Sequence, residues 1–313
     1  MIYRDTCPIC GGAAVSIFSW PFNSLGRACA LDRLPAELAA GFSSAGFEIK
    51  RCANCDFTFQ RVAPDEEEIL HVYALYADEA AIRSEIANQK LHWFAHMTEE
   101  ILVLMQLVAA RPPRVLDYGC NWGKWASMAL AFGCDVEAVE VNPVTAKFCA
   151  ARGIKIVDPS TLPDRSYHFI NVDQVLEHIA DPLALALQLA EKLAPGGYMK
   201  WSTPHDSALP QALARASLAR DPSILHPQRI DALEPLVHLN LFTNQSLRTL
   251  GQRAGLDAVT LPFLKWLGAG QLWNVPRQLG RNLSTPRKRW LGQGTYLWFS
   301  RKAGAPAGSS AGP

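Results

Sequence analysis

The sequence has no hydrophobic run long enough to cross a membrane. Its longest apolar stretch, near residues 101–110, is about half of the ~20 residues that a membrane-spanning helix needs. The first ten residues, MIYRDTCPIC, contain no apolar segment behind a basic start, so no secretory signal is predicted. These absences favour a cytoplasmic location. Thiols stay reduced there, so paired cysteines indicate a metal site before a disulfide.

A strong net charge is also absent. Lysine and arginine number 30 against 29 aspartates and glutamates, which leaves a formal charge of +1. A chain this close to neutral exerts no global attraction on nucleic acid or anionic lipid, so nucleic acid is not an expected partner. Hydrophobic residues make up 49% of the 313 residues and charged residues 19%, which is typical of a globular interior rather than disorder.

Composition divides the chain into four predicted parts. Residues 1–62 are rich in Cys, Gly and Pro and predict a small module. Residues 63–110 carry apolar residues at helical spacing and predict amphipathic helices that pack on the next domain. Residues 111–303 alternate strand-like and helix-like runs, and the low-complexity tail 304–313 is predicted to be disordered.

The third part predicts an α/β fold with a parallel sheet, because its strands alternate with helices of about 10 residues. The predicted strands are RVLDYG (114–119), DVEAVEV (135–141), IKIV (154–157), YHFINVD (167–173), GYMKWST (197–203), DAVTL (257–261) and TYLWFSR (295–301). The predicted helices are 122–132, 143–152, 181–193 and 244–254. No clear helical pattern separates the last two strands, which favours an antiparallel edge.

Four cysteines form two C-x2-C knuckles, Cys7-Pro-Ile-Cys10 and Cys52-Ala-Asn-Cys55. Two knuckles complete a tetrahedral shell of four thiolates, the composition of a closed structural zinc site. Residues 11–51 must then loop out or form a hairpin insert between the knuckles. The alternative is four unrelated reduced cysteines. The remaining ones, Cys29, Cys120, Cys134 and Cys149, are isolated and are expected to be small buried hydrophobes, although Cys29 is an alternative ligand.

A cofactor-binding turn is predicted where the strand 115–118 meets the segment Gly-Cys-Asn-Trp-Gly before a helix. Glycine permits positive φ and a close approach of the backbone to a ligand. Glu140 follows at the end of the next strand, where a carboxylate accepts both hydroxyls of a ribose. These two features alone also suit a dinucleotide-binding domain.

Five motifs in order resemble the class I S-adenosylmethionine-dependent methyltransferases. They are VLDYGCNWG, VEAVEVNP, HFINVDQVLEHIADP, KLAPGGYMKWSTP and HLNLFT, within roughly residues 111–255. LEHIADP and LAPGGY are not usual in NAD-binding domains, which favours the methyltransferase interpretation. Asn121 replaces the middle glycine of the turn and His168 replaces an aspartate at the start of the fourth strand. The resemblance implies a Rossmann-like seven-stranded sheet, with a small zinc ribbon-like module ahead of it.

The same resemblance implies roles for individual residues. Asp117 and the turn residues line the methionine part of the cofactor, Glu140 holds the ribose with Val141 and Asn142 beside it, Asp158 meets the adenine amino group, and Asp173 and Gln174 border the sulfonium. The turn residues are Tyr118, Gly119, Cys120, Asn121 and Gly123.

A four-cysteine module ahead of a methyltransferase domain is similar to the sugar C-methyltransferases and related bacterial enzymes, which act on nucleotide-sugars. Those enzymes carry a further C-terminal domain for which this sequence is too short. The resemblance therefore implies a transferase without fixing carbon as the methylated atom.

Three histidines are candidates for the base that removes an acceptor proton. His178, in Leu-Glu-His-Ile, follows the fourth strand at the carboxyl end of the sheet, where open α/β sheets bind ligands. His205 is second and His238 third; for each, the alternative is a histidine that caps or packs. Glu177 is expected to orient His178 or to bind the acceptor.

The leading functional hypothesis is methyl transfer to a small-molecule or saccharide acceptor, such as a nucleotide-sugar or a polysaccharide end. Residues 263–293, with Trp266, Trp273, Trp290 and Arg287-Lys288-Arg289, suit a phosphorylated or glycosylated acceptor; the alternative is a surface insertion. Two further functions stay open. One is an RNA methyltransferase that uses the zinc module and the basic cluster, and the other is a non-catalytic cofactor-binding protein.

Overall fold

The computed structural model describes residues 1–22, 34–74, 79–204, 208–220, 235–260 and 295–301. Cys29, His205, residues 263–293 and the tail 304–313 lie outside these ranges, so the predictions made for them stay predictions. Among the described residues, none of the helices combines the length and apolarity that spanning a membrane requires.

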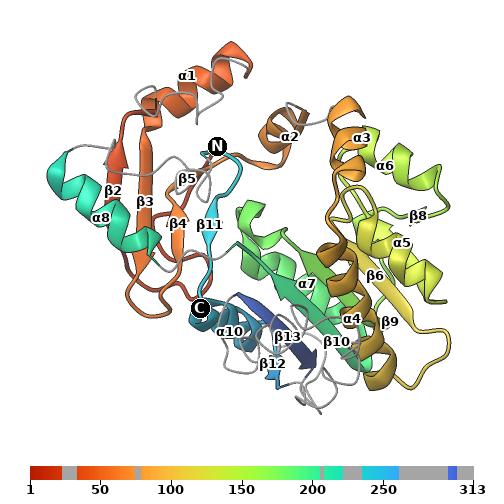
Figure 1. Cartoon of the computed structure of the whole chain (residues 1–313). Helices are drawn as coiled ribbons and strands as arrows, with labels where there is room; N and C mark the ends of the chain where they lie inside the picture. The colour runs from red at the N-terminus through yellow and green to blue at the C-terminus, as the bar shows by residue number, and fades with distance from the viewer. Residues whose placement is uncertain (23–33, 75–78, 205–207, 221–234, 261–294, 302–313) are drawn as a thin grey trace, which may run out of the picture.

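A seven-stranded sheet forms the larger part of the molecule (Figure 1). Its strand order is β12-β13-β10-β9-β6-β7-β8, and its strands are β6 (Arg114–Tyr118), β7 (Asp135–Val139), β8 (Lys155–Ile156), β9 (Tyr167–Asp173), β10 (Leu193–Ser202), β12 (Leu256–Val259) and β13 (Tyr296–Arg301). β13 pairs antiparallel with both β10 and β12, whereas β6, β7, β8, β9 and β10 pair in parallel. The predicted Rossmann-like sheet is therefore confirmed. The antiparallel strand is second from the edge rather than at it.

The helices between the strands begin where a polar side chain caps them. α6 (Pro143–Ala150), α7 (Pro182–Lys192) and α10 (Asn244–Arg253) follow Asn142, Asp181 and Thr243, each of which accepts a hydrogen bond from a backbone N–H of the first turn. α5 (Lys124–Ala131) follows Gly123 instead. The predicted helices exist, and their predicted bounds run one or two residues too long because the cap and the last residue are not helical.

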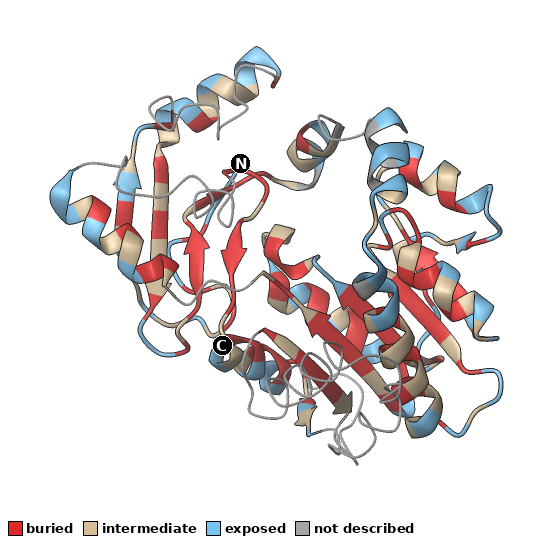
Figure 2. Ribbon diagram, viewed as in Figure 1, coloured by how far each residue is buried: buried red, intermediate tan, exposed pale blue. Residues whose placement is uncertain are grey.

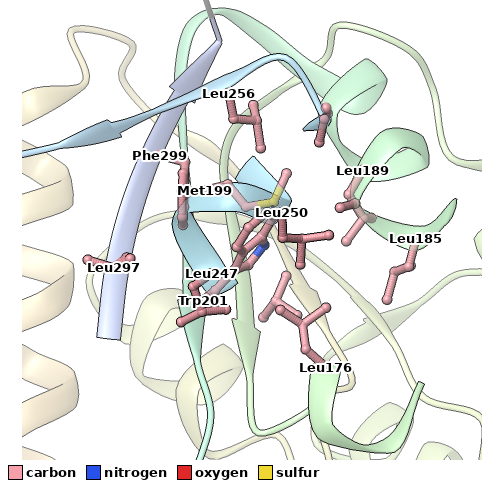
Figure 3. Close-up of a cluster of buried hydrophobic side chains, with 14 of the residues drawn as sticks. Leu176, Leu185, Leu189, Met199, Trp201, Leu247, Leu250, Leu256, Leu297 and Phe299 are labelled. Atoms are coloured by element: carbon pink, nitrogen blue, oxygen red, sulfur yellow. Dashed lines mark hydrogen bonds between the residues drawn. The ribbon is translucent and has the colours of Figure 1, made fainter. Parts of the chain in front are cut away.

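The helices cover both faces of the sheet, and side-chain alternation along the strands supplies a core to each face. On one face α4 (Leu91–Leu107), α5 and α6 enclose buried residues that include Met97, Ile101, Leu104, Trp125, Phe169 and Trp298. On the other face α7 and α10 enclose Leu185, Leu189, Met199, Trp201, Leu247, Leu250 and Phe299 (Figure 3). Figure 2 shows the central strands β6, β7 and β9 of this sheet as largely buried.

A second sheet, in the order β11-β4-β3-β2, lies at the N-terminal side of the molecule. It contains β2 (Ala14–Trp20), β3 (Phe47–Cys52), β4 (Thr58–Gln60) and β11 (Asn240–Leu241), all antiparallel. α1 (Ala36–Ala45) precedes β3, and the short strands β1 (Ile2–Tyr3) and β5 (Val62–Ala63) pair beside it. α2 (Glu66–Ala74) and α3 (Glu79–Ala87) then lead towards the larger sheet.

Two elements of this N-terminal sheet layer come from late in the chain, which a module boundary at residue 62 leaves out. β11 pairs with β4, and α8 (Leu209–Ala219) packs on β2 with Leu209, Leu213 and Ala216 buried among the aromatic side chains of the module. The physical reason is that a module of this size does not bury enough apolar surface alone. β11 covers the edge of β4, and α8 covers β2.

One hydrophobic core runs from the N-terminal sheet into the larger one. Phe57 and Phe59 belong to the same buried cluster as Leu176 and Leu247. Phe242, next to β11, packs its ring against Phe57 with the ring centroids 4.8 Å apart. The N-terminal module and the large sheet are therefore packed as one body around this junction.

Candidate active site and metal centre

The turn after β6 has the backbone conformation that a close-fitting ligand loop needs. Gly119 and Gly123 have φ of 75° and 66°, and a Cβ on Gly119 would lie 2.5 Å from Cγ2 of Val175. Asn121, which stands where related turns have glycine, has φ of 48°. Asparagine tolerates this left-handed conformation better than most residues. The departure at position 121 therefore leaves the turn intact.

Glu140 lies beside this turn because β7 ends at Val139. Its Oε2 accepts a hydrogen bond from the backbone N–H of Asn121 at 2.9 Å, and its Oε1 accepts one from Asn142 at 2.8 Å. Each carboxylate oxygen keeps a second lone pair for a ligand hydroxyl. Burial raises the pKa of Glu140, and the backbone N–H groups oppose that rise.

Asp117 is buried behind the turn, with 2% of its surface exposed. One oxygen accepts from Nδ2 of Asn171 at 2.7 Å and the other from the backbone N–H of Ala126 in α5 at 3.1 Å. Burial raises the pKa of Asp117 to about 7. In this arrangement Asp117 joins β6, β9 and α5 underneath the turn.

The other predicted cofactor residues lie along the carboxyl edge of the sheet. Asp173 and Gln174 are exposed at the end of β9, and Gln174 has φ of 56° with its N–H bonded to Ser202 O at 2.8 Å. Asp158 is exposed, and it accepts hydrogen bonds from the hydroxyl and backbone N–H of Ser160, which lower its pKa. Tyr118 is half-buried, Cys120 is buried and Val141 is 53% exposed.

A buried lysine under Asp173 was not predicted. Nζ of Lys200, in β10, lies 3.2 Å from a carboxylate oxygen of Glu100 in α4 and 3.5 Å from Oδ1 of Asp173. Lys200 and Glu100 are each 1% exposed. In the sequence, Lys200 is a charged residue within the apolar run GYMKWST, and such a residue indicates a buried ion pair. Lys200 therefore ties α4 to the end of β9.

Glu177, His178 and His238 come together beyond the end of β9. The carboxylate and one ring nitrogen of each histidine all lie within 4.8 Å of one another. The His178 and His238 rings have centroids 4.9 Å apart. Glu177 is fully buried, and neither of its oxygens has a hydrogen-bond partner among the described residues. Burial raises the pKa of Glu177 well above its ordinary value.

His178 is held in one tautomer. Its Nδ1 lies 2.9 Å from the carbonyl oxygen of Val237. A carbonyl only accepts, so Nδ1 carries the proton and Nε2 keeps its lone pair. Burial and then the neighbouring His238 lower the pKa of His178 to about 4. The imidazole is therefore neutral throughout the physiological range.

Tyr73, from α2, packs edge-on against the His178 ring with the centroids 6.1 Å apart. Burial raises the pKa of its hydroxyl, and the charges of Glu177 and Glu140 raise it further. Tyr73 therefore lies close enough to interact electrostatically both with Glu140, beside the turn, and with Glu177, beside the histidines. The segment around it carried no sequence signal for this position.

The four cysteines of the two knuckles converge in the N-terminal module. Sγ of Cys7 lies 3.6 Å from Sγ of Cys55, Sγ of Cys10 lies 3.5 Å from Sγ of Cys52, and all four sulfur atoms lie within 4.8 Å. A tetrahedral zinc with Zn–S bonds of ~2.3 Å separates its sulfur ligands by about 3.8 Å. The donor set and its spacing therefore fit zinc.

The isolated cysteines follow the sequence expectation where the structure describes them. Cys120, Cys134 and Cys149 are free of disulfides and buried. Cys149 also donates a weak hydrogen bond from Sγ to Asn121 O at 3.1 Å, so it supports the cofactor turn.

Comparison with known proteins decides the family. A methyltransferase-domain family matches residues 91–261, just over half of the chain. The chain belongs to this methyltransferase-domain family. It is 28% identical over 127 residues to the ubiquinone biosynthesis O-methyltransferase of Xanthomonas campestris pv. campestris (strain B100), a match that covers 36% of this chain and 53% of that protein.

The chain is also similar to a second curated methyltransferase and to a methyltransferase of known structure. Methyltransferase str2 of Strobilurus tenacellus is 26% identical over 95 residues, which is 28% of this chain and 34% of that protein. The chain thus spans about half or less of the length of these curated relatives. The plantazolicin methyltransferase BpumL in complex with SAH superposes with a TM-score of 0.48 at 13% identity, over 75% of this chain and 94% of that one.

Within this methyltransferase domain, the structure brings together most of the residues predicted for the site. The turn 118–123, Glu140, Asn142 and Asp173 line one edge, and Glu177, His178 and His238 gather beside it. Asp117 lies behind the turn and Asp158 caps a short 3-10 helix, η4 (Pro159–Thr161). The unpredicted residues are Tyr73, Glu100, Asn171 and Lys200, whose positions depend on long-range packing.

Proposed function

We propose that the protein transfers a methyl group from S-adenosylmethionine to a hydroxyl of a small-molecule or saccharide acceptor. The observation that carries this proposal is the Glu140 carboxylate held beside the Gly119–Gly123 turn in a methyltransferase-family domain. A backbone turn with positive φ and a ribose-binding carboxylate are what a nucleoside cofactor requires. The likeness to an O-methyltransferase supports a hydroxyl acceptor.

For the cofactor, we assign Glu140 to the ribose hydroxyls, with Val141 and Asn142 beside it. The turn residues Tyr118–Gly123 receive the methionine part, and Asp158 reaches the adenine amino group. Asp173 and Gln174 border the sulfonium. Asp117 acts from behind the turn by fixing α5 and β9 to it.

For the chemistry, we assign the proton transfer to His178. S-adenosylmethionine, when bound, supplies a methyl group on a positively charged sulfur. The acceptor oxygen forms the new C–O bond as the C–S bond breaks, and Nε2 of His178 accepts the hydroxyl proton, since Nδ1 is already bonded to Val237 O. The thioether product leaves with the electron pair of the broken bond. His205 remains the second candidate base.

Glu177 is assigned to the acceptor rather than to the cofactor. A buried carboxyl with two unpartnered oxygens is costly unless a ligand completes its hydrogen bonds. Burial raises its pKa and so favours the protonated form, and a protonated carboxyl both donates and accepts a hydrogen bond. Neighbouring hydroxyls, as on a sugar, offer that combination of donor and acceptor.

Zinc is assigned to Cys7, Cys10, Cys52 and Cys55. A closed set of four thiolates leaves no open position for a substrate, so the role of this metal is structural. Hydrogen bonds from Cys55 and from the N–H groups of Cys10 and Ile9 lower the pKa of the Cys7 thiol, and the same pairing raises the pKa of Cys55.

The experiment is a transfer assay with radiolabelled methyl donor against nucleotide-sugars, lipid-linked saccharides, quinol-type phenols and bulk RNA. Label in a saccharide or phenol hydroxyl supports the proposal, and label in RNA alone contradicts it. Parallel reactions with EDTA are needed because Glu177, His178 and His238 form a donor set that also suits a divalent cation. Activity that EDTA leaves unchanged assigns proton transfer to the side chains.

A further inference from the structure

Arg4 is a buried arginine with 5% of its surface exposed, and no carboxylate lies within ion-pair distance of it in the described part of the chain. Its guanidinium donates instead to neutral oxygens: to Gln60 O at 2.9 Å, Leu239 O at 3.0 Å, Ala180 O at 3.3 Å and Oδ1 of Asn240 at 2.7 Å. Burying a charge without a counterion destabilises the folded state unless hydrogen bonds compensate it. The four contacts also join three segments of the chain at Arg4, namely those that contain Gln60, Ala180 and Asn240.

Asn240 carries this connection to the loop that holds the candidate base. Its Oδ1 accepts from Arg4, and its Nδ2 donates to Leu176 O at 2.8 Å and to Ile179 O at 2.7 Å. Leu176 begins the 3-10 turn η5 (Leu176–His178), and Ile179 follows it. One amide thus holds both ends of the turn that presents Glu177 and His178.

The backbone beside Asn240 contacts the same turn. Val237 O accepts from Nδ1 of His178, and the His238 ring lies against the His178 ring. The N-terminal sheet in turn holds this segment, because Gln60 in β4 donates from Nε2 to His238 O at 2.9 Å and from its N–H to Leu239 O at 2.9 Å. A continuous path of hydrogen bonds leads from the four-cysteine module to the candidate base.

We propose that Arg4 and Asn240 are positioning residues for the acceptor half of the active site, through which the N-terminal module orients Glu177 and His178. The proposal rests on the proposed function, in which these two side chains meet the acceptor. It gives the four-cysteine module a part in catalysis although no cysteine of the two knuckles contacts substrate. The cofactor half has its own support, because Glu140 takes its hydrogen bonds from the backbone of Asn121 and Asn142.

The test variant is Asn240→Asp. It keeps the shape and an oxygen for Arg4, but it loses the N–H donors to Leu176 O and Ile179 O and turns a carboxylate towards these carbonyls. Misplacing a catalytic group by about 1 Å costs up to ~100-fold in rate, so turnover should fall about tenfold to a hundredfold. Affinity for S-adenosylmethionine and zinc content should equal those of the wild type. Arg61→Lys is the control, because Arg61 lies in the same module and pairs with Asp5.

Two readouts separate positioning from general damage. The first is the long-range ¹H–¹⁵N spectrum of the histidine rings, assigned with His178→Ala, which reports the Nδ1–H tautomer of His178 even if no acceptor is yet known. The second is the acid limb of kcat/KM against pH, which should move up towards the ordinary histidine value when His178 leaves its buried position. Arg4→Lys provides the same comparison if Asn240→Asp does not fold.

The proposal is supported if Asn240→Asp alters the His178 signals and lowers turnover while cofactor affinity is kept. It is overturned if the His178 signals and turnover match the wild type, or if turnover and cofactor affinity fall together. Wild-type protein that shows the Nδ1–H tautomer, loses it in Asn240→Asp, and transfers no methyl group would overturn the proposed function while leaving the positioning intact.

Discussion

His178 and Glu140 each have hydrogen-bonding surroundings that are set by backbone groups rather than by other side chains. Val237 O fixes the proton on Nδ1 of His178, and the N–H groups of Asn121 and Asn142 fix the carboxylate of Glu140. Backbone partners are supplied by the fold, so these two side chains are pre-oriented before any ligand binds. Their separate loss should therefore have separate effects.

His178→Ala should lower turnover by about 10²–10⁴-fold, the usual contribution of a general base, and leave cofactor affinity nearly unchanged. Because burial and His238 lower the pKa of His178 to about 4, the imidazole is neutral above that value, and the acid limb of kcat/KM should lie nearer pH 4 than pH 6.5. Stopped assays at a series of pH values measure both the turnover and the position of the acid limb. His168→Asn is the control, since His168 lies at the opposite end of β9. Full turnover in His178→Ala would show that another residue is the base.

Glu140→Ala should weaken S-adenosylmethionine binding about tenfold to a hundredfold, because hydrogen bonds to a charged group contribute ~1.5–3 kcal/mol. Glu137→Gln is the matched control on the same strand. Glu137 lies in the middle of β7, where it accepts hydrogen bonds from Arg114 and Tyr167, and its loss should affect stability without changing cofactor affinity. Equal affinity in Glu140→Ala and wild type, measured by equilibrium binding, would remove Glu140 from the ribose.

Individual residues were predictable where a local pattern carries the information. Asn121 was identified as the residue that replaces the middle glycine of the turn, and it has φ of 48°. Arg4, Asn240 and Lys200 were not identified, since a buried polar residue gives no sign in the sequence of which distant segment it contacts. The meeting of His238 with His178 joins two segments far apart in the chain, which spacing along the sequence does not reveal.

At the scale of elements, the strands and helices predicted within residues 114–301 were recognisable because the strands are short apolar runs and because α6, α7 and α10 begin at capping residues. The N-terminal sheet was less so. β11 has two residues, and it pairs with β4, a strand about 180 residues earlier in the chain. Pairing between segments this far apart is set by tertiary packing, and two residues contain no periodicity to detect.

Zinc should co-purify at about one ion per chain, and Cys52→Ser should remove it, because three thiolates do not close a structural site. Residues 237–240 connect the module to the turn that contains His178. Loss of the module's order should therefore also lower turnover, while the affinity for S-adenosylmethionine stays unchanged. Metal analysis and cofactor titration of the same preparation measure both, with Cys134→Ser as the control. Freshly purified reduced protein without zinc would contradict the assignment.

At the scale of the whole molecule, one hydrophobic cluster joins the two sheets. In the proposed function, the cofactor half of the active site belongs to the large sheet, and the acceptor half is bounded by segments that the N-terminal sheet holds. With a net charge of +1, the chain as a whole exerts little long-range attraction on a polyanion, which is consistent with the small acceptor that we propose. This division predicts that substitutions in the N-terminal module lower turnover, whereas substitutions in the turn 118–123 weaken cofactor binding.

The central claim is that the cofactor is S-adenosylmethionine, and calorimetric titration of the full-length protein tests it most directly. S-adenosylmethionine and S-adenosylhomocysteine should each bind saturably at one site per chain, and NAD should give no binding heat at the same concentrations. The Glu140 carboxylate beside the Gly119–Gly123 turn should account for this preference in part, so Glu140→Ala should weaken both sulfur ligands. Saturable binding of NAD with no binding of either sulfur ligand would contradict the account.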